Sequence, residues 1–235
     1  MPSPIVVFDL DGTLVDTAPD LVGTLNTVLR AEGLAELPFA AARELIGGGA
    51  RPMLERGLER NGVALDPARL DRLFAHFLDH YSAHIADRSQ PFAGLEAALD
   101  DLTGAGFTLA VCTNKLERLA RQLLDALELT PRFAVICGQD TFGTKKPDPL
   151  VWQRTIAEAK GDLSRAVMVG DSVTDIRFAR AAGAPVIAVD FGYTDIPVAQ
   201  LDPDRIISHF DDLGAAVDAL LPDVRPAVAG RSAAR

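Results

Sequence analysis

Short apolar segments alternate with amphipathic helical patterns along the chain from Gly94 onward. The apolar segments cover residues 107–112, 134–137, 166–169, 186–189 and 205–207, and the helical patterns cover 95–102, 116–124, 149–160, 174–182 and 211–221. Continuous apolar strands separated by amphipathic helices are typical of a parallel sheet that helices cover on both faces. The sequence therefore predicts a doubly wound α/β fold, in which ligands bind beyond the carboxyl ends of the strands.

Two aspartates follow the first apolar segment, residues 4–8, and a glycine comes directly after them. Side chains at positions i and i+2 of an extended segment point to the same side, so Asp9 and Asp11 converge on one centre beyond the strand. Such a pair can hold Mg²⁺ and can divide the roles of nucleophile and proton donor. The alternative is a plain turn, because Asp-Gly is a common turn signal and Asp9 would then be a solvated residue.

Polar residues follow three later parts of the pattern: Thr113 with Asn114, then Lys146, then Asp171 with Asp175. Each of them also has an ordinary structural explanation. A hydroxyl after a strand often caps a helix, a lysine beside a proline is usually solvated, and Gly-Asp-Ser often forms a turn. Their order along the chain is what favours a shared site.

With these motifs in this order, residues 4–222 resemble the haloacid dehalogenase superfamily, and within it the phosphatases. The four motifs of that family match Asp9-Leu10-Asp11-Gly12-Thr13, Thr113, Lys146, and Gly170-Asp171 with Asp175. Haloacid dehalogenases themselves lack the second aspartate of the first motif, so Asp11 favours phosphoryl transfer over dehalogenation.

The resemblance implies phosphoryl transfer to Asp9, which forms an aspartyl phosphate. It implies Mg²⁺ as the cofactor, held by Asp9, the backbone carbonyl of Asp11, and Asp171. Asp11 would protonate the leaving group and then activate water, and Asp175 would orient Lys146 or a metal-bound water. The other residues expected at the phosphoryl group are catalytic Thr113 and Lys146, and substrate-binding Gly12, Thr13 and Asn114.

The stretch between the first two strands is far longer than an ordinary connection and carries helical patterns. By the resemblance, residues 17–91 form a helical cap domain, which closes over a Rossmann-like catalytic core made of residues 1–16 and 92–222.

The glycine-rich segment 46–51 is where this cap is expected to bind the substrate. Glycines allow close approach of the backbone to a ligand, and an arginine binds carboxylates or phosphates, which favours Gly48 and Arg51. The same composition is also typical of a flexible turn between two helices.

Residues 43–58 resemble the cap loop region of phosphoglycolate phosphatases, which makes 2-phosphoglycolate the first expected substrate. A sugar phosphatase, a pyrophosphatase or a phosphoglucomutase-like phosphotransferase of the same fold stays open. From another class, a receiver-like phosphorylated signalling module is disfavoured, because receivers phosphorylate an aspartate after a later strand and have no cap insertion.

The net charge of −10 bears on the expected partner. It disfavours nucleic acid and anionic membranes, so the expected partner is a small phosphorylated metabolite bound together with a cation. No apolar run approaches the ~18 residues of a membrane span, and the N-terminal run stops at Asp9, unlike a signal peptide. These features predict a cytoplasmic protein. The expected assembly is a monomer or a homodimer, between which the sequence does not decide.

A few residues stand outside these motifs. Cys112 and Cys137 fall in predicted buried strands, where a thiol behaves as a small hydrophobe, although a redox role for Cys112 is conceivable. The i, i+4 spacing of His76, His80 and His84 suits either zinc or the polar face of a helix. Two further expectations concern Asp148, which precedes a proline as a helix N-cap, and the Ala-, Pro- and Arg-rich residues 223–235, a disordered tail.

Overall fold

The computed structural model describes residues 2–64, 66–194, 196–222 and 224. Its main sheet has six strands in the order β5-β4-β1-β6-β7-β8, and all neighbours pair in parallel. The strands are β1 (Ser3–Phe8), β4 (Thr108–Cys112), β5 (Val135–Cys137), β6 (Gly161–Gly170), β7 (Val186–Val189) and β8 (Arg205–Ile207). The doubly wound parallel sheet predicted from the sequence is confirmed.

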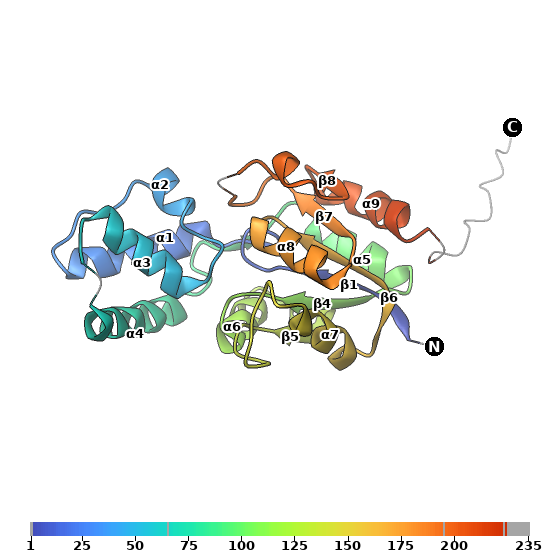
Figure 1. Ribbon diagram of the computed structural model, residues 1–235, viewed down its shortest axis with the longest axis horizontal. Coiled ribbons are helices and arrows are strands. Elements are labelled where there is room, and N and C mark those ends of the chain that lie inside the picture. Colours follow the sequence, from blue (N-terminus) through green and yellow to red (C-terminus); the bar gives the residue numbers. More distant parts are fainter. Residues whose placement is uncertain (1, 65, 195, 223, 225–235) are drawn as a thin grey trace, which may run out of the picture.

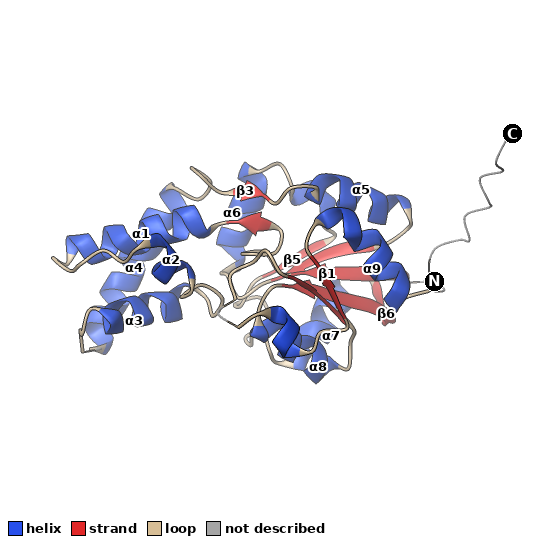
Figure 2. Ribbon diagram, turned by 90° about the horizontal axis from the view of Figure 1, so that it is seen from above, coloured by secondary structure: helices blue, strands red, loops and turns tan. Residues whose placement is uncertain are grey.

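Helices cover both faces of this sheet (Figure 2). Successive side chains of β1 point to opposite faces, so Val6 and Phe8 join one apolar cluster and Ile5 and Val7 join another. The first cluster contains side chains of α5 (Leu95–Gly104), α6 (Glu117–Ala126) and α9 (Leu213–Leu220), and the second contains side chains of α7 (Pro149–Glu158) and α8 (Val173–Ala182). The central strand is therefore buried on both sides, as its continuous apolar sequence requires.

The starts of α7 and α8 lie at the carboxyl edge of the sheet and are capped by side chains. Asp148 accepts a hydrogen bond from the N–H of Leu150 at 2.9 Å, which confirms its prediction as an N-cap. At the start of α8, Ser172 and Asp175 form a capping box, with the Asp175 carboxylate bonded to the Ser172 N–H at 3.1 Å. This cap places Asp175 in the first turn of the helix, facing the end of β1.

Four helices lie apart from the sheet, at the left of Figure 1. They are α1 (Ala18–Ala31), α2 (Phe39–Arg43), α3 (Ala50–Arg60) and α4 (Pro67–Ala83). Two short antiparallel strands, β2 (Val15–Asp16) and β3 (Gln90–Pro91), connect this helical part to the core. We call this pair of strands the hinge.

The two chain crossings at the hinge are held together by a buried carboxylate. Asp20, in the first turn of α1, accepts hydrogen bonds from the Arg88 N–H at 3.0 Å and from the Ser89 N–H at 2.8 Å. The Ser89 hydroxyl donates a third bond at 2.7 Å. The helical part is thereby joined to the core through one compact connection.

Several remaining expectations can be placed in the structure. His80 contacts the Thr24 hydroxyl at 3.1 Å, and His84 contacts the Asp87 carboxylate at 2.7 Å. Burial raises the pKa of the Cys112 thiol to about 12, so it stays protonated. In the part of the chain that the structure describes, every helix is too short or too polar to cross a membrane. The predicted tail, 223–235, lies outside the described residues except for Val224.

Candidate active site

The ends of three adjacent strands bring the motif residues together. In the parallel register, Phe8 at the end of β1 pairs with Val111 of β4 on one side and with Val169 of β6 on the other. The residues that follow these strands are Asp9, Thr113 and Asp171, so all three lie at the same edge of the sheet. This is the edge at which parallel α/β sheets bind their ligands.

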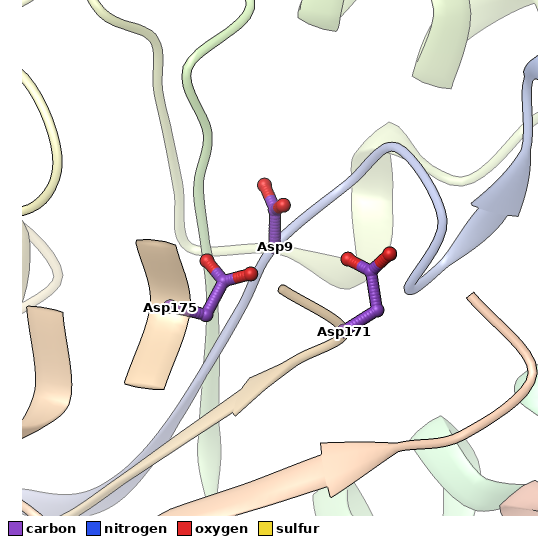
Figure 3. A group of neighbouring side chains, drawn as sticks. All are labelled: Asp9, Asp171 and Asp175. Carbon is purple, nitrogen blue, oxygen red and sulfur yellow. The ribbon is translucent and has the colours of Figure 1, made fainter. Parts of the chain in front are cut away.

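Three carboxylates form the centre of the site. Asp9, Asp171 and Asp175 each offer an oxygen atom within 4.8 Å of the others (Figure 3). Such close approach needs space around Asp171: a Cβ atom on Gly12, which has a φ of +83°, would lie 2.4 Å from the Asp171 Oδ2 atom. Gly12 of the first motif is therefore required by steric fit as well as by its backbone conformation.

One buried cation faces these carboxylates. The Lys146 Nζ atom donates a hydrogen bond of 2.6 Å to Asp175 Oδ1 and lies 2.9 Å from Asp9 Oδ1. Burial alone would lower the pKa of Lys146, but the charges of Asp175 and Asp9 outweigh it and hold the pKa above its ordinary value. Lys146 is thus a permanent ammonium, and one positive charge faces three acidic side chains.

Burial and the neighbouring acids also change the pKa values of Asp9 and Asp171. Burial, reinforced by neighbouring acids, raises the pKa of Asp9 to about 6 and that of Asp171 to about 8. The buried Asp9 Oδ1 atom has the Lys146 ammonium 2.9 Å away, outside ordinary hydrogen-bond geometry, and accepts no other hydrogen bond from the described residues. Oxygen ligands that are buried, close together and short of positive charge are the donor set that a hard divalent cation prefers, so this cluster fits such an ion.

The elevated pKa values predict how the metal-free protein responds to pH. A carboxyl whose folded-state pKa is raised stabilises the fold below its ordinary pKa, and this contribution is lost as the pH rises through the folded-state value. For Asp171 the window runs from 3.8 to about 8. We expect the contribution of Asp171 to the free energy of unfolding in EDTA to fall across this window, on the order of a few kcal/mol.

Urea unfolding at several pH values, with and without Mg²⁺, measures this effect. Asp171→Asn is the matched variant, because the amide can accept from the Tyr193 N–H and donate to the Thr13 hydroxyl, which bond the carboxylate at 2.8 Å and 3.1 Å. The variant is expected to lose less stability than the wild type between pH 5 and pH 8. Equal pH dependence of the free energy of unfolding in the two proteins would show that the pKa of Asp171 is not raised in the folded protein.

Asp11 points away from the carboxylate cluster in this conformation. Its Oδ1 atom accepts hydrogen bonds from the Thr17 hydroxyl at 2.8 Å and from Lys115 Nζ at 2.8 Å, and its Oδ2 atom lies 3.0 Å from the same ammonium. Lys115 Nζ also lies 4.6 Å from the ring centroid of Tyr81, which belongs to α4. Asp11 is therefore joined through Lys115 to the helical part of the molecule.

Lys115 was not assigned a role from the sequence. Burial would lower its pKa, but Asp11 and Tyr81 raise it above the ordinary value, so the side chain is charged although it is only 7% exposed. A signal was present in the sequence, since Lys115 directly follows Asn114 in the segment after the second predicted strand. Its contact with Tyr81 depends on how the helical part sits on the core, which no local pattern reports.

Thr113 and Asn114 are both buried in the loop after β4. The Thr113 N–H donates to the Cys137 carbonyl at 2.9 Å, and its hydroxyl accepts from the Lys115 N–H at 3.2 Å. The Asn114 amide donates to the Lys146 carbonyl at 3.3 Å and so joins the two loops. Both residues line a cavity between the sheet edge and the helical part.

The cavity between the sheet edge and the helical part is partly open to solvent. From the core it is lined by Asp9, Asp11, Thr113, Asn114 and Lys115. The opposite wall is mainly apolar and comes from the helical part, with Ile46, Met53, Phe74, Leu78 and Tyr81. Among the described residues that line the cavity, Lys115 is the only lysine or arginine.

Gly48 and Arg51, the two cap residues that the sequence favours as substrate ligands, are not among the described residues that line the cavity. Gly47 and Gly49 line the cavity, whereas the Cβ position of Gly48 faces Pro52. Arg51 was expected to reach the substrate, but its guanidinium pairs with Asp71 at 2.7 Å outside the lining of the cavity. The reason is that Arg51 lies in the first turn of α3, where its guanidinium also covers the Phe74 ring of α4 at 4.6 Å.

The fold and the site together define a doubly wound α/β protein with inserted helices beside the sheet edge that carries the acidic cluster. Residues 6–189 match the family model of haloacid dehalogenase-like hydrolases, and the chain belongs to this family. The resemblance seen in the sequence is thereby confirmed.

Individual relatives place the chain within this family. It is 51% identical over 213 residues to the phosphoglycolate phosphatase of Mesorhizobium japonicum, covering 91% of this chain and 94% of the relative. The phosphoglycolate phosphatase of Caulobacter vibrioides is 49% identical over 216 residues, 92% of this chain and 91% of the relative.

Among solved structures, a predicted phosphoglycolate phosphatase from Haemophilus somnus superposes with a TM-score of 0.86 at 27% identity, covering 91% of this chain and 97% of that chain. These similarities show that the protein is a phosphatase, which excludes the receiver-like alternative.

Proposed function

We propose that the protein is a Mg²⁺-dependent phosphomonoesterase that hydrolyses 2-phosphoglycolate through an aspartyl phosphate on Asp9. The observation that carries this proposal is the grouping of Asp9, Asp171 and Lys146 at one edge of the sheet, where buried acids outnumber the cation that faces them. The chain resembles phosphoglycolate phosphatases over about nine tenths of its length, and this similarity is the reason for proposing 2-phosphoglycolate as the substrate.

The metal would be held by Asp9, the backbone carbonyl of Asp11, and Asp171. When bound, it would supply the positive charge that lets a carboxylate approach a phosphate dianion. Asp175 stays behind these ligands in our proposal, because its two oxygens are already bonded to Lys146 and to Ser172, at 2.6 Å in each case. Its role is to hold the Lys146 ammonium beside the nucleophile.

The chain's own residues divide the remaining work. Asp9 attacks phosphorus, and Lys146 stabilises the charge that gathers on the phosphoryl oxygens. The Thr113 hydroxyl and the Asn114 amide donate hydrogen bonds to the transferring group, and Gly12 and Thr13 complete the loop around it. Because the Thr13 hydroxyl is bonded to Asp171, this loop and the proposed metal ligand are positioned together.

Asp11 is proposed as the proton donor to the leaving oxygen and as the base that then activates water. Its carboxylate lines the same cavity as Asp9, which satisfies the first requirement of this role. In the present conformation Thr17 and Lys115 hold both of its oxygens. Substrate binding must therefore replace part of these contacts before Asp11 can act.

The composition of the cavity favours a short acidic substrate. Its cap wall is mainly apolar and offers few partners for the hydroxyl groups of a sugar, which would be left unpaired there. The Lys115 ammonium, by contrast, is a partner for a carboxylate on the substrate. We infer that it binds the carboxylate of 2-phosphoglycolate when its pairing with Asp11 is relaxed.

Lys115→Met tests this inference with two substrates that differ in the carboxylate. Ethyl phosphate replaces the carboxylate of 2-phosphoglycolate with a methyl group, so any effect of the variant on Asp11 applies to both compounds. In the variant, the ratio of kcat/KM for 2-phosphoglycolate to kcat/KM for ethyl phosphate is expected to fall by about 10- to 100-fold. This fold-change corresponds to the loss of one hydrogen bond to a charged group. An unchanged ratio would show that Lys115 does not bind the carboxylate.

Kinetics against a panel of phosphate esters test the proposed substrate itself. The panel contains 2-phosphoglycolate, sugar phosphates, nucleoside monophosphates and pyrophosphate, each measured with Mg²⁺ and after its removal by EDTA. We expect 2-phosphoglycolate to have the highest kcat/KM and EDTA to abolish turnover. A preference for a sugar phosphate or pyrophosphate would replace the proposed substrate, and transfer without release of free phosphate would identify a mutase.

A further inference from the structure

The loop after β7 touches the proposed metal site, the hinge and the helical cap. Within this loop, the segment from Phe191 to Tyr193 follows Val189 at the carboxyl edge of the sheet. The proposed mechanism assigns it no role. Its contacts on three sides are nevertheless specific and largely buried, which is unusual for a surface connection.

Tyr193 connects two of these parts through the two ends of one residue. Its backbone N–H donates to Asp171 Oδ2 at 2.8 Å. Its phenol, buried at the hinge, donates to Asp16 Oδ1 at 2.5 Å and accepts from the Ala18 N–H at 3.0 Å. The side chain is 4% exposed, so these bonds are shielded from water. Tyr193 thus links the Asp171 carboxylate to the point where the chain enters the cap.

Arg43, at the end of α2, connects the same loop to the cap from the other side. Its guanidinium donates to the Gly192 carbonyl at 2.6 Å and to the Phe191 carbonyl at 3.2 Å. The same group lies 5.0 Å from the centroid of the Tyr193 ring. The planar fork of an arginine can satisfy two carbonyls at once, and a lysine offers only a point charge in its place.

The packing leaves no slack between this loop and Asp171. A Cβ atom on Gly192 would lie 2.2 Å from the Asp171 Cβ atom, so the Gly192 backbone rests directly against the carboxylate residue. A shift of the loop must therefore move Asp171 or break its bond to the Tyr193 N–H. Densely packed contacts of this kind transmit displacement and do not absorb it.

We propose that Arg43 and Tyr193 are positioning residues that couple the seating of the cap to the geometry of the metal ligand Asp171. With the cap seated as in this structure, Arg43 holds the two carbonyls and Tyr193 aims its N–H at the carboxylate. By thermodynamic linkage, a metal ion bound by Asp171 must in turn favour the seated cap. This coupling rests on the proposed function, because that function makes Asp171 a metal ligand.

Direct binding of Mn²⁺ to the substrate-free protein, followed by calorimetry, is the first test. Arg43→Ala is expected to weaken binding by about 5- to 50-fold, which lies within the usual range of coupling between sites. Arg43→Lys, which keeps the charge but not the fork, should recover part of the loss. Tyr193→Phe removes only the phenol bonds at the hinge and should weaken binding in the same direction. The control is Arg60→Ala, an arginine at the end of α3 whose guanidinium lies 3.7 Å from Glu44.

Amide hydrogen exchange at the hinge gives a readout that does not depend on activity. In the wild type and in Arg60→Ala, Mg²⁺ is expected to slow exchange at residues 14–17 and 89–92, whereas in Arg43→Ala it should have no such effect. Unchanged Mn²⁺ affinity together with unchanged protection in Arg43→Ala would overturn the coupling and leave the phosphatase proposal intact. A wild type that binds no divalent cation would instead overturn the proposed function, and the coupling with it.

Discussion

Asp9→Asn is expected to lower kcat for 2-phosphoglycolate by at least about 10³-fold while the protein stays folded. The amide that replaces the carboxylate is not a nucleophile, and Asp9 is the carboxylate nearest to Lys146 apart from Asp175. Asp175 is not a replacement nucleophile, because both of its oxygens are occupied by Lys146 and Ser172.

The thermal stability of Asp9→Asn distinguishes loss of the nucleophile from loss of the folded structure. Asp9 is a buried acid whose pKa is raised, mainly by burial, so its neutral amide should not destabilise the metal-free fold above neutral pH. Thermal unfolding in EDTA is therefore expected at the wild-type temperature or slightly above it. Asp125→Asn, an exposed site on α6, serves as the control and should keep full activity. Substantial turnover by Asp9→Asn would remove Asp9 as the nucleophile.

Lys146→Met is expected to have the second large effect, and here activity and stability should fall together. The variant leaves Asp9 and Asp175 buried without the ammonium that pairs with both. Removing one partner of a buried ion pair costs about 3–5 kcal/mol of stability. The loss should be greater at pH 8 than at pH 5, because the raised pKa values of Asp9 and Asp171 allow both groups to take up protons at the lower pH.

The neighbouring lysine provides a matched control. Lys145 is exposed and directly precedes Lys146, so Lys145→Met changes the same kind of side chain outside the site. It should leave both kcat and the free energy of unfolding close to the wild-type values. Comparable losses in the two variants would show that the segment, and not the Lys146 charge, is what matters. Urea unfolding at the two pH values and steady-state kinetics make this comparison.

Much of the core could be predicted because its strands are buried on both faces. The segments 186–189 and 205–207 agree with β7 and β8 residue for residue. The strand expected at 166–169 was too short, since β6 begins at Gly161. Its first part is polar and partly exposed and pairs at Ser3 before an irregularity in the register, so hydrophobicity alone does not reveal it.

The site was predictable where each residue directly follows a strand. Asp9 and Asp171 are placed by the parallel register itself, and the cap of α8 then brings Asp175 beside them. Lys115 and Tyr193 were missed because they make contacts between the core and the helical part. Their partners are separated from them by many residues in sequence, and no local period reports such contacts.

The contacts of Arg51 also depend on tertiary packing that the sequence pattern does not report. A basic residue in a glycine-rich cap loop is a reasonable ligand for an anion, yet here Asp71 and Phe74 of α4 bind it. Arg43 lies eight positions earlier in the same segment and reaches the core. Which arginine faces inward is decided by the helix orientation in the cap, and that is a matter of tertiary packing.

Mass spectrometry of the protein quenched in acid during turnover tests the central claim most directly. With 2-phosphoglycolate and Mg²⁺, the peptide that contains Asp9 should gain the mass of one HPO₃ group, and hydroxylamine should remove it, as expected for an acyl phosphate. Asp9→Asn should show no such gain under the same conditions. A phosphoryl group on another residue, or rapid turnover without any covalent adduct, would contradict the account.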